Sequence, residues 1–376
     1  MLPARHAESP SLRHVLAGAA AALTGLSSVL RLPRVRSAAV VLVDGLGSAP
    51  LAVRAGHARR ILAAVPKRGG RLHSGFPSTT ASALASLTTG LLPGEHGLTG
   101  YSAVDAQHDR VVTLLSDWDD RLVPREWQPH PTLFECAIEQ GVDAVVIAPE
   151  RYRSTGFTDA VLRGARFVPA ASIAGRIDAA IGELAEPGQR LVYVYIPELD
   201  AAGHAHGTAS AQWLRRLEEL DAALAHVERL LPVDAGLLLT ADHGMIDVPE
   251  HRRLVIAGDD PLWEGVRHVA GEPRCLQLAL EPGADLLEVR ARWEESEGSR
   301  SWVVSRAEAI DAGWFGSVGP DVVSRIGDLL IAARSAIAYY DERTATPRSR
   351  AMVGQHGSFS PEETGIPLAR WGAFSL

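Results

Sequence analysis

The stretch "SAAVVLVDG" (residues 37–45) is a short apolar run, rich in β-branched residues, that ends on an Asp-Gly pair. Runs of this length and composition are typical of strands that are buried on both faces, as in a parallel sheet. Similar runs occur at residues 142–150, 190–200 and 235–244, and helical patterns such as 210–231 separate them. Strands that alternate with helices predict an α/β fold with a doubly wound, mostly parallel sheet.

The pattern of the sequence changes near residue 271. We expect an N-terminal helical segment at 1–36, a core formed by 37–270 and 326–376, and a small α+β insert at 271–325. Within the insert, the pattern indicates a strand, a helix, a second strand and a short helix. Residues 326–340 are predicted to form a hairpin that returns to the core.

Composition narrows the class of protein. The chain has 376 residues, and 46% hydrophobic with 22% charged residues is usual for a globular enzyme. The formal net charge of -8 argues against a nucleic acid polymer as partner. No apolar run reaches the roughly 18–20 residues that a membrane span needs.

The expected location is cytoplasmic. Cys136 and Cys275 have no CxxC spacing and suit a reducing compartment. The alternative is export, because the apolar stretch at 14–30 resembles the core of a signal peptide. That stretch also fits an Ala/Leu-rich helix that packs on the first strand, which is the interpretation we favour.

Three predicted strands end in an acidic residue, namely Asp44, Asp200 and Asp242. A single acid at such a place is more often a helix cap or a turn residue. In open α/β sheets, however, ligands bind beyond the carboxyl ends of the strands. We therefore expect the three carboxylates to converge there.

Histidines accompany these acids. His204 lies one helical turn after Asp200, so both side chains can reach one ion. His243 directly follows Asp242. Adjacent residues in a strand point to opposite faces, so these two can share an ion only if the strand has already ended. His356 stands between glycines in "GQHG", and His206 is expected to be peripheral. The candidate metal ligands are Asp44, Asp200, His204, Asp242, His243 and His356.

The mixture of carboxylates and imidazoles indicates the kind of metal. Such a set suits zinc, manganese or iron better than magnesium, which prefers oxygen alone. Six ligands are too many for one tetrahedral ion but suit two divalent ions. A pair about 3.5–4 Å apart stabilises the attacking and leaving oxygens of a displacement at phosphorus.

The stretch "FPSTTASALASLTTG" (76–90) is rich in hydroxyl side chains at a predicted helix start. Ser78, Thr79 and Thr80 are candidates for the helix cap, and one of them is expected to serve as such. A threonine hydroxyl also acts as a nucleophile when a base or a metal activates it. The stretch alone does not decide between the two interpretations.

Together these segments resemble the nucleotide pyrophosphatase/phosphodiesterase family of the alkaline phosphatase superfamily. The matching segments occur in the family's order: "VDGLG" (43–47), "FPSTTASALASLTTGLLPGEHG" (76–97), "LDAAGH" (199–204), "TADHGM" (240–245) and "GQHG" (354–357). The resemblance implies an alkaline-phosphatase-like core. It also implies an enzyme that hydrolyses phosphodiester or pyrophosphate bonds in small, nucleotide-type substrates.

The resemblance implies a role for each matching residue. Thr80 matches the nucleophile, which would form a phospho-threonine that water later hydrolyses. The zinc that activates it would be held by Asp44, Thr80, Asp242 and His243. The second zinc would be held by Asp200, His204 and His356.

The sequence departs from the family pattern at two positions. Thr79 stands where many relatives carry Lys, and Ala83 stands where the phosphodiesterases place an Asn that holds a phosphoryl oxygen. A replacement donor would come from backbone amides at the helix start, from residues 96–101 or from the insert. The departures keep two alternatives open: a phosphomonoesterase or phosphonate hydrolase with the same site, or a metal-containing binding protein with little turnover. The sequence makes no prediction of the oligomeric state.

Overall fold

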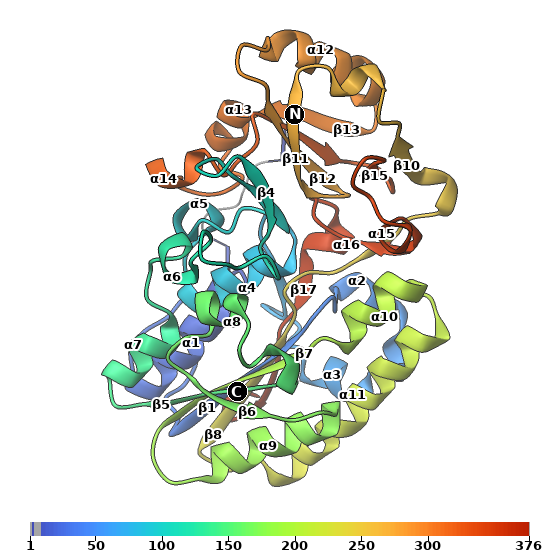
Figure 1. Ribbon diagram of the computed structural model, residues 1–376. Coiled ribbons are helices and arrows are strands. Elements are labelled where there is room, and N and C mark those ends of the chain that lie inside the picture. Colours follow the sequence, from blue (N-terminus) through green and yellow to red (C-terminus); the bar gives the residue numbers. More distant parts are fainter. Residues whose placement is uncertain (1, 4–8, 376) are drawn as a thin grey trace.

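The computed structural model describes residues 2–3 and 9–375. Within these residues the larger sheet has six strands, of which five are parallel and the edge strand β18 is antiparallel. Their order is β18 (Ala369–Gly372), β8 (Ala235–Thr240), β1 (Ser37–Val43), β7 (Arg190–Ile196), β5 (Asp143–Ala148) and β6 (Arg166–Pro169). The predicted α/β fold is confirmed (Figure 1).

The central strands are buried because helices cover both faces of this sheet (Figure 1). All seven residues of β1 are buried, as its uninterrupted apolar sequence predicts. One face carries α1 (Arg13–Thr24), α4 (Thr80–Thr89) and α7 (Leu133–Glu139). The other face carries α9 (Ile173–Ala185) and α11 (Ala211–Leu230), and α11 confirms the helix predicted at 210–231.

The apolar stretch near the N-terminus forms α1. Its side chains Val15, Leu16, Ala19 and Leu23 are fully buried in the main core, where the helix packs against β1 and β7. The helix ends at Gly25, which adopts a left-handed conformation. Among the described residues, no helix combines the length and the apolar character needed to cross a membrane.

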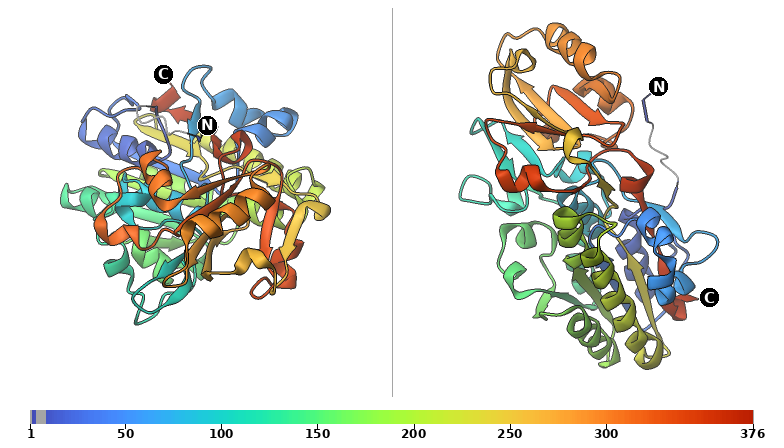
Figure 2. Two further views of the ribbon diagram at one scale, coloured as in Figure 1. Left: turned by 90° about the horizontal axis from the view of Figure 1, so that it is seen from above. Right: turned by 90° about the vertical axis from the view of Figure 1, so that its right-hand side faces the viewer.

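A second sheet lies at one end of the core (Figures 1 and 2). Within the described residues it has four antiparallel strands, in the order β11 (Val266–Glu272), β12 (Cys275–Leu280), β14 (Leu329–Ala333) and β13 (Ser301–Ser305). Helices α12 (Leu286–Glu297) and α13 (Arg306–Asp311) accompany it. The sheet therefore extends on both sides of the range 271–325, and the division of the chain into domains stays a prediction.

The prediction of a hairpin at residues 326–340 is wrong. β14 pairs on both sides within the second sheet, whereas β15 (Ala338–Asp341) pairs in parallel with β10 (Arg253–Ile256). All five residues of β14 are buried, because it lies between β12 and β13. An apolar run of five residues predicts a strand but does not reveal which strands lie beside it.

Shorter elements connect the two sheets and surround the site. They are α2 (Ser48–Val53), α3 (Arg59–Ala64), β2 (Arg71–His73), α5 (Pro93–His96), β3 (Ser102–Asp105), β4 (Arg110–Thr113), α6 (Pro124–Trp127), α8 (Gly156–Val161), α10 (Glu198–His206), β9 (Ile246–Asp247), α14 (Pro320–Val323), α15 (Pro347–Ala351), β16 (Gly354–Gln355), α16 (Pro361–Thr364) and β17 (Gly365–Pro367). β9 pairs with β16, and β2 pairs with β17.

Candidate active site

The structure brings all six predicted metal ligands together at the carboxyl end of the main sheet. They follow β1, β7, β8 and β16, and are Asp44, Asp200, His204, Asp242, His243 and His356. This is where ligand sites form in open α/β sheets. The predicted convergence of the strand-end acids is therefore confirmed, while the role of each residue stays a prediction.

One cluster consists of Asp200, His204 and His356. Nε2 of His204 lies 3.3 Å from Oδ1 of Asp200 and 3.3 Å from Nε2 of His356. Nε2 of His356 lies 3.9 Å from the same carboxylate oxygen. The candidate ligand atoms of the three residues lie within 4.8 Å of one another, close enough to share one cation. His206 is exposed near the end of α10, which agrees with its predicted peripheral place.

The second cluster surrounds the ring of His243. Its Nε2 lies 3.6 Å from Oδ1 of Asp44, 3.4 Å from Oδ2 of Asp242 and 3.1 Å from Oγ1 of Thr80. β8 ends at Thr240, so the chain has left the strand before these residues and can turn both side chains inward. Asp200 also lies within 4.8 Å of ligand atoms of Asp44 and His243, so the two clusters adjoin.

The three histidines are held with Nε2 facing the site. In each case Nδ1 lies close to a backbone carbonyl oxygen. The distance is 2.8 Å from His204 to Gly354 and 3.0 Å from His243 to Gly244. It is 2.9 Å from His356 to Ser78. A carbonyl oxygen only accepts hydrogen bonds, so Nδ1 carries the proton and Nε2 presents a lone pair. Metal-binding histidines are oriented by hydrogen bonds of this kind.

Three carboxylate oxygens face these lone pairs. Oδ1 of Asp44, Oδ1 of Asp200 and Oδ2 of Asp242 are buried and have no hydrogen-bond partner among the described residues. Each of them lies 3.3–3.6 Å from a histidine Nε2. Buried, unpaired acceptors are costly, and a cation between them removes that cost. The donor set therefore fits divalent cations in both clusters.

The pKa values of the site residues also suit a bound cation. Burial and the neighbouring Asp242 and Asp200 raise the pKa of Asp44 well above its usual value. Burial and the two other histidines of the site lower the pKa of His356 well below its usual value. The protein alone therefore disfavours both a carboxylate at Asp44 and a protonated ring at His356, and a bound cation reverses the first preference.

Tyr195 is a site residue that the sequence did not single out. It lies near the end of β7, and its hydroxyl donates a hydrogen bond to Oδ2 of Asp44. That bond uses one carboxylate oxygen and leaves Oδ1 directed at His243. The run "YVYI" shows two tyrosines on a buried strand, but the sequence does not indicate which hydroxyl reaches the site.

Thr80 is the first residue of α4. The residue that caps the helix is Thr79, but its side chain makes no capping hydrogen bond. Ser78 is also engaged elsewhere: its hydroxyl donates to the carbonyl of Ser358 and accepts from the N–H of Gly357. Thr79 thus occupies the expected N-cap position, but the expected capping hydrogen bond is not formed, because the Ser78 hydroxyl bonds the neighbouring loop and the Thr79 side chain bonds Glu272.

Ala83 lies in the main hydrophobic core and is 3% exposed. Its methyl group packs among core side chains because α4 is buried along its whole length. Two of the segments named as sources of a replacement donor contact each other, and Glu272 also bonds the side chain of Thr79. The N–H of Tyr101 donates to Oε2 of Glu272 over 3.0 Å. Burial raises the pKa of Glu272 to about 8, although hydrogen bonds from Tyr101 and Thr79 act in the opposite direction.

A doubly wound sheet with adjoining carboxylate–histidine clusters at its carboxyl edge has the fold and the donor groups of a hydrolase. The sequence profile described as "Type I phosphodiesterase / nucleotide pyrophosphatase" matches residues 38–359. The chain belongs to this family, and the predicted resemblance is confirmed. It is an enzyme that hydrolyses phosphoester bonds.

Solved structures share the fold at low sequence identity. Murine ectonucleotide pyrophosphatase/phosphodiesterase 5 is 18% identical, with a TM-score of 0.67 over 88% of this chain and 87% of that chain. An inactive threonine-to-alanine variant of that protein, in complex with AMP, matches with the same identity and TM-score over 89% and 87%. Phosphonoacetate hydrolase from Sinorhizobium meliloti 1021, in complex with phosphonoacetate, is 20% identical, with a TM-score of 0.68 over 90% and 91%. No curated protein sequence matches the chain.

Proposed function

We propose that this enzyme cleaves phosphodiester or pyrophosphate bonds of small, nucleotide-type substrates with Thr80 as the nucleophile. One observation carries the proposal: Oγ1 of Thr80 lies 3.1 Å from Nε2 of His243, beside buried carboxylate oxygens that have no other described partner. A hydroxyl in these surroundings is suited to activation by a cation.

The proposed cofactors are two divalent cations, most readily zinc, with manganese or iron as alternatives. Mixed carboxylate and imidazole donors favour these metals. One cation would be held by Asp44, Thr80, Asp242 and His243, and the other by Asp200, His204 and His356. When bound, the cations would lower the pKa of the Thr80 hydroxyl and offset the charge of the phosphoryl group.

The reaction proceeds through Thr80 in two displacements. Its Oγ1 loses its proton and forms a bond to phosphorus while the bond from phosphorus to the leaving oxygen breaks, so the products are a phospho-threonine and a leaving group that takes up the proton. A water then attacks phosphorus, and the bond to Oγ1 breaks as the hydroxyl is restored. Thr80 begins α4, so N–H groups of the first helical turn would be available to the phosphoryl oxygens and would stabilise their negative charge.

Relatives support the substrate class. The murine structure contains AMP, which is a nucleotide, and the bacterial hydrolase contains phosphonoacetate. Both compounds present a tetrahedral phosphorus with charged oxygens. A phosphomonoester or a phosphonate is therefore the alternative substrate for the same site.

The test compares hydrolysis of bis(p-nitrophenyl) phosphate, p-nitrophenyl phosphate and phosphonoacetate by the zinc-loaded enzyme. We expect the diester to react fastest, and Thr80→Ala to lose activity by at least about 1,000-fold. Thr88→Ala is the matched control, because within the described part of the chain that hydroxyl bonds the Leu84 carbonyl of its own helix and no site residue. Full activity of Thr80→Ala would overturn the proposal, and no hydrolysis of any compound would favour a binding protein.

We also propose a cytoplasmic location. Its support is that Cys136 and Cys275, the two cysteines of the chain, are free thiols. Reducing compartments keep cysteines in this state. Cell fractionation followed by immunoblotting tests the proposal, and recovery of the protein outside the cytoplasm would contradict it.

A further inference from the structure

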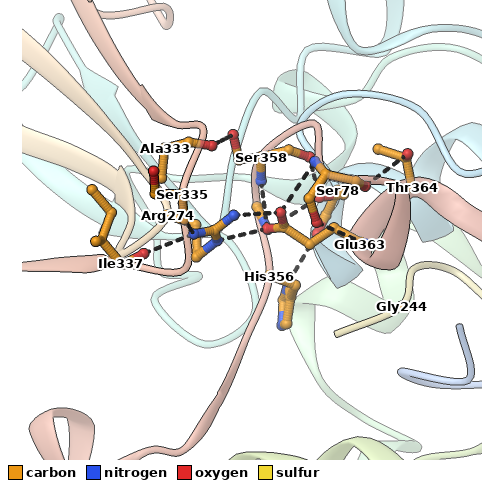
Figure 3. Close-up of polar contacts among 12 residues, drawn as sticks. Ser78, Gly244, Arg274, Ala333, Ser335, Ile337, His356, Ser358, Glu363 and Thr364 are labelled. Atoms are coloured by element: carbon orange, nitrogen blue, oxygen red, sulfur yellow. Dashed lines mark hydrogen bonds and ion pairs between the residues drawn. The ribbon is translucent and has the colours of Figure 1, made fainter. Parts of the chain in front are cut away.

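A buried ion pair connects the second sheet to the loop that carries His356 (Figure 3). Arg274 lies in the turn between β11 and β12, and Glu363 lies in α16. The guanidinium donates from Nε to Oε1 over 2.9 Å and from Nη2 to Oε2 over 2.6 Å. Both side chains are fully buried. Arg274 is itself fixed, because its Nη1 donates to the carbonyls of Ser335 and Ile337.

Glu363 holds the loop on the other side of this pair. Its Oε1 accepts the N–H of Ser358 over 3.0 Å, and its Oε2 accepts the N–H of Ser360 over 3.2 Å. Ser358 lies only two residues after His356. The backbone carbonyl of Glu363 also accepts the N–H of Gly244 over 2.7 Å, directly after His243. One residue therefore contacts the segments that carry two of the three site histidines.

The same loop is attached to the turn before the nucleophile. Ser78 donates from its hydroxyl to the carbonyl of Ser358 over 2.7 Å, and its own carbonyl lies 2.9 Å from Nδ1 of His356. The N–H of Gly357 donates to the Ser78 hydroxyl over 3.1 Å. The direction of the His356 ring thus depends on a loop that Glu363 fixes at Ser358.

We infer that Glu363, held by Arg274, is a positioning residue that orients His356 and thereby sets the affinity of the cation site formed by Asp200, His204 and His356. This inference rests on the proposed two-cation function. Groups that orient a metal ligand without touching the metal usually contribute 10- to 100-fold in affinity. A carboxylate that receives four hydrogen bonds, two of them from a fixed guanidinium, provides such an orientation.

The test is a titration of the chelator-treated, full-length protein with Zn²⁺ in competition with a chromogenic chelator, which resolves two dissociation constants. For Glu363→Gln we expect one constant to rise by about 10- to 100-fold and the other to stay within about threefold. His356→Ala should weaken the binding of the same ion. Because Glu363 acts through His356, the double variant should bind that ion no more weakly than His356→Ala alone.

Glu297→Gln is the matched control. Glu297 is 4% exposed and accepts two hydrogen bonds from Arg300, but it makes no described hydrogen bond to the loop at 354–360. We expect both of its dissociation constants to equal those of the wild type. Should Glu363→Gln fail to fold, Glu363→Asp keeps a negative charge near Arg274 but shortens the side chain that bonds Ser358, and should weaken the binding of the same ion.

Two results would overturn the inference. One is unchanged affinity for both ions in Glu363→Gln, or in Glu363→Asp if that variant replaces it. The other is a double variant in which the losses simply add. In either case a wild type that binds two ions leaves the proposed function intact. Fewer than two ions in the wild type would overturn the proposed function together with this inference.

Discussion

Oγ1 of Thr80 lies 3.1 Å from Nε2 of His243, so the start of α4 meets the chain that leaves β8. The Nδ1 proton of His243 is directed at the carbonyl of Gly244, so its Nε2 presents a lone pair to the hydroxyl. The pair therefore joins a candidate nucleophile to a candidate metal ligand.

Cations should stabilise the folded protein. Three buried carboxylate oxygens have no described hydrogen-bond partner, and a bound cation pairs with them only in the folded state. Zinc at 100 times its dissociation constant should raise the free energy of unfolding by about 2.7 kcal/mol for each site. Urea denaturation with and without zinc measures this difference. Equal stability in both conditions would contradict the assignment of the clusters to metal.

Asp44→Asn should affect the metal-free and metal-loaded proteins in opposite directions. Burial and neighbouring acids raise the pKa of Asp44, so without a cation the folded site disfavours its ionised form. An amide carries no charge to be buried beside these acids and should therefore raise the stability of the chelated protein. The same change should reduce the stabilisation by zinc. Thermal unfolding of both proteins, with and without zinc, gives the comparison, and a parallel loss in both forms would refute the prediction.

Tyr195→Phe should weaken the binding of one cation. The phenol donates a hydrogen bond to Oδ2 of Asp44 and so directs Oδ1 toward His243. Loss of this bond should cost roughly 10-fold or more in the affinity for the cation at Asp44. Tyr193→Phe is the matched control, since its buried hydroxyl has no described hydrogen-bond partner. Equal zinc affinity of the two variants would show that Tyr195 does not orient the carboxylate.

Glu272→Gln should change how stability depends on pH. The pKa of Glu272 rises from 4.5 to about 8, chiefly through burial. Between these values the folded protein binds one proton more than the unfolded chain. The wild type should therefore lose about 1.4 kcal/mol per pH unit from this group as pH rises, a loss that is complete above about 8. In chelated protein, the stability of Glu272→Gln relative to wild type should rise from pH 5 to pH 8.

Glu297→Gln is the control for this pH dependence. Burial raises the pKa of Glu297, but hydrogen bonds from Arg300 and Tyr339 outweigh it and leave the pKa below its usual value. Glu297 is therefore ionised in both states above pH 5, and its variant should differ from wild type by a constant amount. A constant difference for Glu272→Gln as well would mean that Glu272 is ionised in the folded protein.

Much of the fold was predictable because local sequence determines it. Buried parallel strands need uninterrupted apolar runs, so β1, β5, β7 and β8 are evident from residues 37–45 and the similar runs. The position of β14 was not predictable, because any apolar run fits between two other strands. The acids at strand ends predicted the site, since parallel strands bring their carboxyl ends to one edge of the sheet.

Other parts of the site could not be predicted from the sequence because they depend on tertiary contacts. Tyr195 and Glu272 stand in strands where many residue types occur. Only the folded chain shows that Tyr195 contacts Asp44 from the neighbouring strand and that Glu272 accepts a hydrogen bond from Tyr101. The burial of Ala83 follows from the covering of α4 on every side. The network of Arg274 and Glu363 joins residues 89 positions apart in the chain.

The most direct test of the account is to locate the reaction intermediate. The zinc-loaded enzyme would be mixed with bis(p-nitrophenyl) phosphate, quenched in acid during turnover, digested and analysed by mass spectrometry. The account predicts a substrate-derived phosphoryl ester on Thr80 that disappears once the substrate is consumed. Rapid turnover by a Thr80→Ala variant, or a phosphoryl ester on a different residue, would contradict it.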